Sequence, residues 1–256
     1  MDKRLSEFQK LLDIMDELRV KCPWDSKQTN DSLRTLTIEE VYELADAVIN
    51  ANDNEIKKEL GDILLHIVFY AKIGEENKTF DIYDVIKSIN EKLIYRHPHI
   101  FSDVKVNTAK DVEENWERLK LKEGKKKTVL GGIPNSLPAM VKAHRIQDKA
   151  RGVGFDWDEK EQVWDKVLEE YKELMAEVKS ADEEKIEAEF GDFLFSVINA
   201  ARLYGINPEN ALEKTNIKFI KRFNYLEQHT ITVGKDLKDM SLDEMNTIWE
   251  EAKKKI

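Results

Sequence analysis

An acidic pattern that occurs twice at a constant distance is the strongest constraint on how this chain folds. Each copy has two glutamates three residues apart, followed by a glutamate and an aspartate three residues apart, and residues at this spacing share one face of a helix. Equivalent acids are separated by the same distance, since 170 − 40 and 192 − 62 both give 130. The pattern therefore predicts two similar helical units. Its members are Glu40, Glu43, Glu59 and Asp62 in the first copy and Glu170, Glu173, Glu189 and Asp192 in the second.

The spacing of these acids indicates a metal site. If the two helices of a copy pack antiparallel, four carboxylates meet along one seam, where they repel one another and are costly to remove from water. A hard divalent cation with oxygen ligands removes that cost, and Mg²⁺ is the simplest candidate, with Mn²⁺ as a possible substitute. The alternative is a pair of solvated, glutamate-rich helix faces, because glutamate is a good helix former.

Two repeated glycines favour the metal site over the solvated face. Gly61 and Gly191 lie beside the acids at equivalent positions. A glycine inside a helix costs about 1 kcal/mol relative to alanine. We therefore expect close backbone approach at these two positions, from a partner helix or from a ligand.

The composition indicates long helices with few turns. The 256 residues include only ten glycines and five prolines, while 36% are charged. We predict an all-α chain of two tandem helical bundles, with an N-terminal domain at 1–123, a linker at 124–134 and a C-terminal domain at 135–256. The helices are expected at about 3–20, 31–50, 54–76, 81–97 and 108–122 in the first half, and at about 136–151, 159–180, 182–204, 208–229 and 241–255 in the second.

Charge and cysteine usage exclude several classes of partner. The formal net charge of −10 argues against general affinity for nucleic acid. The single cysteine, Cys22, excludes an internal disulfide and fits a reducing compartment. There is no apolar run near eighteen residues and no export signal, so we expect a cytoplasmic protein that does not enter a membrane.

A basic motif repeats as well. An asparagine is followed two residues later by a lysine and six residues later by an arginine in both halves. Lysine and arginine four apart on a helix repel slightly unless an anion lies between them, although a solvated face is the simpler alternative. A tryptophan also recurs near the end of each fifth predicted helix, where packing alone would explain it. The repeated residues are Lys92, Arg96 and Trp116 in the first half and Lys218, Arg222 and Trp249 in the second.

Carboxylates for a cation, together with nearby lysine and arginine, suit a nucleoside triphosphate. No phosphate-binding G-x-x-x-x-G-K-[ST] loop is present, and no serine or cysteine has a partnered base, so water is the expected nucleophile. His66, four residues after Asp62, raises the alternative of a di-iron site. The second copy has Ser196 there, so we expect His66 in the core and an all-oxygen metal site.

The doubled acidic pattern resembles that of the MazG nucleoside triphosphate pyrophosphohydrolases, which belong to the all-α NTP pyrophosphatase group. Further stretches resemble the two-domain members of this family along almost the whole chain. They are Cys22-Pro23-Trp24-Asp25, Arg96-His97-Pro98-His99, Asn115-Trp116-Glu117-Arg118, Ile133-Pro134, Leu137-Pro138-Ala139 and Val153-Gly154-Phe155-Asp156-Trp157.

The resemblance implies a homodimer that hydrolyses NTPs or dNTPs between the α and β phosphates with Mg²⁺, giving a monophosphate and pyrophosphate. It implies metal-binding and catalytic roles for the acids of the C-terminal half, which carries the activity in the best-known members. The implied catalytic metal ligands are Glu170, Glu173, Glu189 and Asp192. The first copy keeps the same acids, Glu40, Glu43, Glu59 and Asp62, as a second metal site that we expect to be weaker because its neighbouring lysines differ. The implied nucleotide-binding residues are Lys166, Val167, Leu168, Glu169, Glu170, Lys185, Ile186, Glu187, Ala188, Lys218, Arg222 and Trp249.

The two halves differ in their lysines, and this difference predicts which half works. Lys166 corresponds to Leu36, and Lys185 corresponds to Glu55. Each lost contact weakens the binding of a polyphosphate by about 1–3 kcal/mol. Lys57 and Lys58 lie nearby and compensate in part. We therefore predict that the C-terminal half is the main catalyst.

Two alternatives stay open at this point. One is a narrower pyrophosphohydrolase acting on dUTP, dCTP or phosphoribosyl-ATP, since such enzymes use related acidic motifs. The other is a non-catalytic helical module that binds a metal or a nucleotide and regulates another protein. Release of pyrophosphate from a panel of nucleotides separates the three readings.

Overall fold

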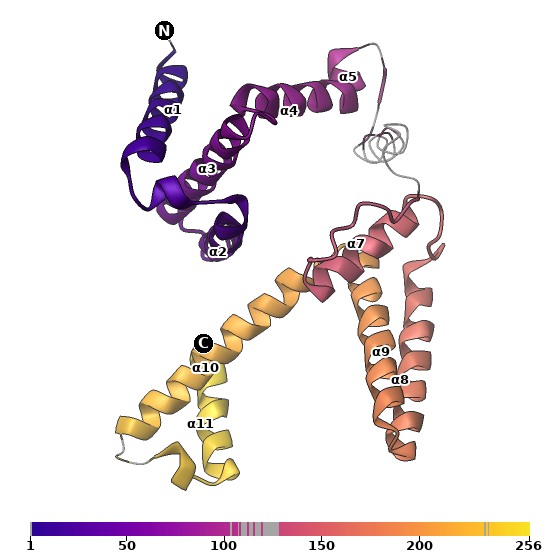
Figure 1. Cartoon of the computed structure of the whole chain (residues 1–256). Helices are drawn as coiled ribbons and strands as arrows, with labels where there is room; N and C mark the ends of the chain where they lie inside the picture. The colour runs from indigo at the N-terminus through magenta and orange to yellow at the C-terminus, as the bar shows by residue number, and fades with distance from the viewer. Residues whose placement is uncertain are drawn as a thin grey trace. The chain divides into compact units, whose positions relative to one another are not determined.

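A computed structural model describes residues 2–102, 104–106, 108, 112, 115, 119, 128–232, 234 and 236–256. The chain divides into two compact units, Met1–Val112 and Glu113–Ile256, called here the N-terminal and C-terminal units. Every regular element of the described residues is a helix, which confirms the all-α prediction (Figure 1). Most of the predicted helix at 108–122, including Trp116, lies outside the described residues, as do residues 124–127 of the predicted linker.

The N-terminal unit is built around three helices that share one core. Its elements are α1 (Lys3–Lys21), the 3₁₀ turn η1 (Asp25–Lys27), α2 (Asn30–Ile49), α3 (Asp53–Glu76), α4 (Ile82–Arg96) and α5 (Pro98–Phe101). The core consists of Met15 from α1, Leu33 from α2, and Val68, Phe69 and Ile73 from α3. Helices α1 to α4 begin and end within a residue or two of the predicted bounds, and Asp81 caps α4 by accepting a hydrogen bond from the Asp84 amide.

The C-terminal unit repeats this order. Its elements are α7 (Ala139–Arg151), η2 (Lys160–Gln162), α8 (Val163–Ser180), α9 (Glu183–Leu203), α10 (Pro208–Thr232), η3 (Leu237–Asp239) and α11 (Leu242–Lys255). Two helices begin later than predicted. Pro138 disfavours the helical conformation in the residue before it, so α7 begins at Ala139, and residues 160–162 form a 3₁₀ turn ahead of α8.

The two acidic helices of each unit form a tight antiparallel hairpin, visible in Figure 1 as the pairs α2–α3 and α8–α9. The turns are equivalent, because Ala51 (φ 51°) and Ala181 (φ 58°) both adopt the left-handed conformation and lie 130 positions apart. The next residues, Asn52 and Asp182, cap the second helix through their side chains. Each hairpin therefore sets the acids of its two helices opposite one another through the same local geometry.

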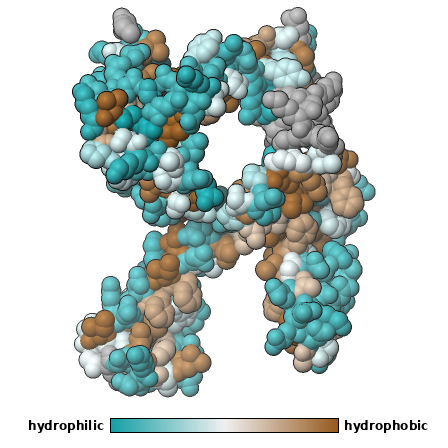
Figure 2. Space-filling model, viewed as in Figure 1, coloured by the Kyte–Doolittle hydropathy of each residue, from teal (hydrophilic) through white to brown (hydrophobic). Residues whose placement is uncertain are grey.

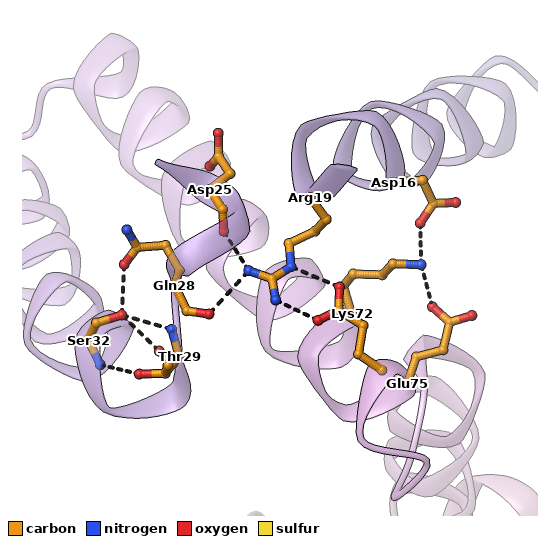
Figure 3. Close-up of polar contacts among 9 residues, drawn as sticks. Asp16, Arg19, Asp25, Gln28, Thr29, Ser32, Lys72 and Glu75 are labelled. Carbon is orange, nitrogen blue, oxygen red and sulfur yellow. Dashed lines mark hydrogen bonds and ion pairs between the residues drawn. The ribbon is translucent and has the colours of Figure 1, made fainter. Parts of the chain in front are cut away.

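A buried arginine fixes the loop before the first acidic helix in each unit. In the N-terminal unit the Arg19 guanidinium donates to the Glu76 carboxylate (2.9 Å) and to the carbonyl oxygens of Asp25 and Gln28 (Figure 3). In the C-terminal unit Arg202 binds Asp156. The two arginines come from different helices, α1 and α9. The equivalent loops of the two units are therefore held by different contacts.

Gln28 links this arginine to the start of α2. Its side-chain oxygen accepts a hydrogen bond from the Ser32 hydroxyl (2.7 Å), and Ser32 and Thr29 form a reciprocal capping box (Figure 3). A separate ion-pair group, Asp16–Lys72–Glu75, joins α1 to α3. Among the described residues, no helix is both long and apolar enough to span a membrane.

Candidate metal centre

Each hairpin brings three carboxylates together. In the N-terminal unit, one carboxylate oxygen from each of three glutamates on α2 and α3 lies within 4.8 Å of the others, and the same holds on α8 and α9 of the C-terminal unit. We call these groups the N-terminal and C-terminal clusters. The N-terminal cluster is Glu40, Glu43 and Glu59, and the C-terminal cluster is Glu170, Glu173 and Glu189.

Each cluster runs from the protein interior to solvent. Glu59 and Glu170 are buried, with 3% and 6% of their surface exposed, whereas Glu43 and Glu173 face solvent. One buried oxygen in each cluster lacks a hydrogen-bond partner among the described residues. These oxygens are Oε2 of Glu59 and Oε2 of Glu189. A buried carboxylate oxygen without a donor is energetically unfavourable, and a bound cation would satisfy it.

Burial, together with repulsion from neighbouring carboxylates, raises the pKa of one glutamate in each cluster. The pKa of Glu40 is raised, chiefly by removal from water and then by the charge of Asp62 and of the other cluster members. The pKa of Glu189 is raised by the same causes, with Glu173 and Asp192 as the largest neighbouring charges. The fourth predicted acid of each copy, Asp62 or Asp192, therefore adds negative charge without joining the group of converging oxygens.

Each cluster has a lysine paired with its most buried glutamate, but the two lysines come from different positions. Lys166 lies 2.7 Å from Oε1 of Glu170 and 2.8 Å from Oε1 of Glu169 on the same helix. In the N-terminal cluster, the Lys58 ammonium lies 2.9 Å from Oε1 of Glu59.

Of the two lysines predicted to compensate in part, Lys57 and Lys58, only Lys58 forms an ion pair with a cluster member among the described residues. Adjacent residues of a helix do not normally face each other, so the sequence does not indicate this pair. The position equivalent to Lys166 is Leu36, which packs against the core, and the position equivalent to Lys58 is Ala188. The paired lysine therefore lies on the first helix of the C-terminal hairpin, α8, and on the second helix of the N-terminal hairpin, α3.

Several predicted nucleotide-binding residues make no hydrogen bond or ion pair with the C-terminal cluster among the described residues. The Lys185 ammonium is 3.5 Å from the carboxylate of Asp182, the helix cap. Val167 is buried in the core with Val163 and Ala200, while Leu168 is exposed. Along α9, Ile186 is half-buried, and Glu187 and Ala188 are exposed.

The predicted phosphate-binding residues of α10 lie apart from the acids within one chain. Among the described residues, no hydrogen bond or ion pair joins Lys218, Arg222 or Trp249 to the C-terminal cluster. Lys218 is exposed, and the buried Nε of Arg222 has no partner among the described residues. The Trp249 ring packs on Phe219 at 5.0 Å between centroids. In the N-terminal unit, Lys92 is exposed and Arg96 is half-buried on α4.

Close backbone approach at the two glycines was predicted from a partner helix or from a ligand, and no other helix of the described residues makes such an approach. A Cβ atom built on Gly61 or Gly191 would meet no atom within 4 Å. The helix face beside the acids is therefore open in both units. The prediction for His66 is confirmed, since it is a buried residue of α3 and belongs to neither cluster.

Comparison with known proteins agrees with this geometry. The MazG nucleotide pyrophosphohydrolase domain matches the chain twice, over residues 28–101 and 159–226, and each match contains one cluster. The chain belongs to the MazG family. The fold and family predicted from the sequence are thereby confirmed.

Two relatives that match this MazG chain over nearly their full length carry the corresponding names. A Thermotoga maritima protein named nucleoside triphosphate pyrophosphohydrolase/pyrophosphatase MazG is 44% identical, over 96% of this chain and 95% of its own length. An Escherichia coli nucleoside triphosphate pyrophosphohydrolase is 38% identical over 98% of both chains. YabN of Bacillus subtilis is 47% identical over 96% of this chain, which corresponds to 52% of the YabN length.

Proposed function

We propose that this chain is a Mg²⁺-dependent nucleoside triphosphate pyrophosphohydrolase that converts NTPs or dNTPs to monophosphates and pyrophosphate. The observation that carries the proposal is the C-terminal cluster, in which three carboxylate oxygens converge and one buried oxygen has no donor. The family and the names of the full-length relatives support the same reaction class.

The donor set fits a hard divalent cation. All converging atoms are carboxylate oxygens, which Mg²⁺ prefers, and no histidine or cysteine of the described residues joins them. Glu170, Glu173, Glu189 and the neighbouring Asp192 would hold the cation, which would stabilise negative charge on the phosphate oxygens when bound.

The remaining chemistry is assigned to side chains of the α8–α9 hairpin and of α10 and α11. Water attacks the α phosphorus, the bond between this phosphorus and the α–β bridging oxygen breaks, and pyrophosphate leaves with that oxygen. A carboxylate of the cluster accepts the proton of the attacking water. Lys166, at the edge of the cluster, and Lys218 and Arg222 hold phosphate oxygens, while Trp249 lies against the nucleoside.

Analysis of the products tests the reaction type directly. Each NTP and dNTP should yield the monophosphate and pyrophosphate in equal amounts when Mg²⁺ is present. Chromatography of the products measures this, with a sample containing a chelator as the control. Diphosphate and orthophosphate as the products would contradict the proposal, because they require cleavage at the β–γ linkage.

We also infer a homodimer, because each hairpin helix leaves an apolar stripe uncovered in its own unit. The stripe residues are 38–57% exposed and occupy equivalent positions in the two units, 130 apart. Figure 2 shows hydrophobic residues at the surface in several places. The stripes are Ile38, Val41 and Val48 on α2, Leu60, Leu64 and Ile67 on α3, Leu168, Tyr171 and Val178 on α8, and Phe190, Leu194 and Val197 on α9.

A second copy is the occupant that this repetition favours, since surfaces of this kind mark association sites and a twofold interface uses the same patch on both chains. A second copy would also supply a route by which the α10 residues of one chain approach the acids of the other, which they do not contact within one chain.

Charge placed on the stripes is expected to separate the copies. Leu64→Lys combined with Leu194→Lys should reduce the mass in light scattering from twice the 29.9 kDa of one chain to that of one chain. The matched control is Leu5→Lys, which changes an exposed leucine of α1 outside the stripes. A single-chain mass for the unaltered protein, or an unchanged dimer in the double variant, would contradict the assignment.

A further inference from the structure

Each hairpin carries one lysine beside its acids, but the lysine lies on a different helix in each hairpin. Lys58 on α3 and Lys166 on α8 occupy non-equivalent positions, and the positions equivalent to them hold Ala188 and Leu36. Each ammonium nevertheless lies within 2.9 Å of the most buried glutamate of its own cluster. One cation per cluster is therefore retained in both units, although the residue that carries it differs.

The environment of Glu59 shows why such a cation matters. Its side chain is almost completely buried, and its two oxygens are unequal, because Oε1 is bound by Lys58 whereas Oε2 has no partner among the described residues. Oxygens of Glu40 and Glu43 lie within 4.8 Å of an oxygen of Glu59. The carboxylate is thus half-neutralised by the lysine, and a further positive charge is favourable at the centre of the cluster.

The Lys58 ammonium is well placed to leave. Its side chain is 60% exposed, so it can exchange Glu59 for water without being desolvated. A divalent cation bound by the three glutamates would be attracted by the same negative charges as the lysine. It would also repel the Lys58 ammonium, which lies 2.9 Å from Oε1 of Glu59.

We propose that Lys58 is a resident counter-ion which a divalent cation displaces from Glu59, and that the freed ammonium then binds the phosphate that accompanies the metal. The N-terminal cluster is accordingly a cation and pyrophosphate site of its own, with Lys58 in the role that Lys166 has in the C-terminal cluster. This inference rests on the proposed function for its metal, but it assigns a site and a residue to the other half of the chain.

Titration with Mn²⁺ alone tests the first part, using electron paramagnetic resonance to count bound ions without any turnover. In a Glu173→Gln background, which removes a ligand of the C-terminal cluster, Lys58→Ala should tighten Mn²⁺ binding about two- to fivefold, the worth of a partly exposed ion pair. Lys57→Ala, which removes the same charge from the neighbouring exposed residue, should change it by less than about twofold. Lys58→Gln repeats the test with the side-chain length kept.

Methylenebisphosphonate, a pyrophosphate analogue that is not hydrolysed, tests the second part. With saturating Mn²⁺ its binding should weaken about tenfold in Lys58→Ala and should be unchanged in Lys57→Ala. Lys58→Ala is therefore expected to bind Mn²⁺ more tightly and methylenebisphosphonate more weakly than the chain with Lys58. Unchanged or weaker Mn²⁺ binding in both Lys58 variants would overturn this inference alone, and so would the absence of a Mn²⁺ site in the Glu173→Gln background. Absence of Mn²⁺ from the unaltered chain would instead overturn the proposed function.

Discussion

Glu173→Gln is expected to reduce the hydrolysis of nucleoside triphosphates at least about 100-fold, because it removes one charged oxygen donor from the C-terminal cluster. Glu173 is exposed, so its loss leaves the core intact, and the neutral amide keeps the shape of the side chain. The measurement is release of pyrophosphate under saturating Mg²⁺, with circular dichroism as the check on folding.

Glu43→Gln is the matched comparison, since Glu43 is the equivalent exposed member of the N-terminal cluster. It should retain most of the activity, because this cluster has Glu55 where the C-terminal unit has Lys185, and a negative charge there opposes a polyphosphate. Loss of activity in Glu43→Gln together with an active Glu173→Gln variant would show that the N-terminal half is the catalyst.

Arg202→Met should produce the largest loss of stability, about 3–5 kcal/mol in the free energy of unfolding. The Arg202 side chain is 5% exposed and donates to Asp156 (3.0 Å) and to Asn199 (2.9 Å). Its removal leaves the Asp156 carboxylate largely buried without its cation. Urea unfolding followed by tryptophan fluorescence measures the change, because Trp157 and Trp164 lie near this contact in sequence.

An exposed ion pair provides the control for this substitution. Lys253→Met breaks the pair with Glu250 on α11, where both side chains face solvent, and should cost less than about 1 kcal/mol. Equal losses in the two variants would mean that burial does not determine the strength of the Arg202 contact. Arg202→Met with Asp156→Asn should recover part of the loss, since the unpaired charge is then gone.

The helices were predictable because capping side chains and prolines close to each end determine where most of them begin and end. Asp81 and Ser241 cap helices as residues of their type do, and Pro98 follows the helix that ends at Arg96. The predicted start of α8 was too early because residues 160–162 form a 3₁₀ turn ahead of the helix. The pattern of apolar residues does not distinguish a short 3₁₀ turn from the first turn of an α-helix.

The convergence of the carboxylates was predictable from the sequence, whereas the lysine beside them was less so. Acid spacing alone placed the converging glutamates on two helices, because the hairpin geometry is set by short turns. The ion pair of Lys58 with Glu59 could not be read from spacing, since adjacent helical residues usually diverge. The separation of Lys218 from the acids depends on where α10 leaves the bundle, which is a tertiary property.

The hairpin has a consequence for how this protein folds. All four acids of a copy fall within 23 consecutive residues, 40–62 or 170–192. Contacts between residues so close in sequence close small loops and form rapidly. The acids are therefore brought together as soon as two neighbouring helices dock, without waiting for distant segments. Because each unit assembles its acids locally, the two units can carry the accompanying lysine on different helices while the acids keep the same arrangement.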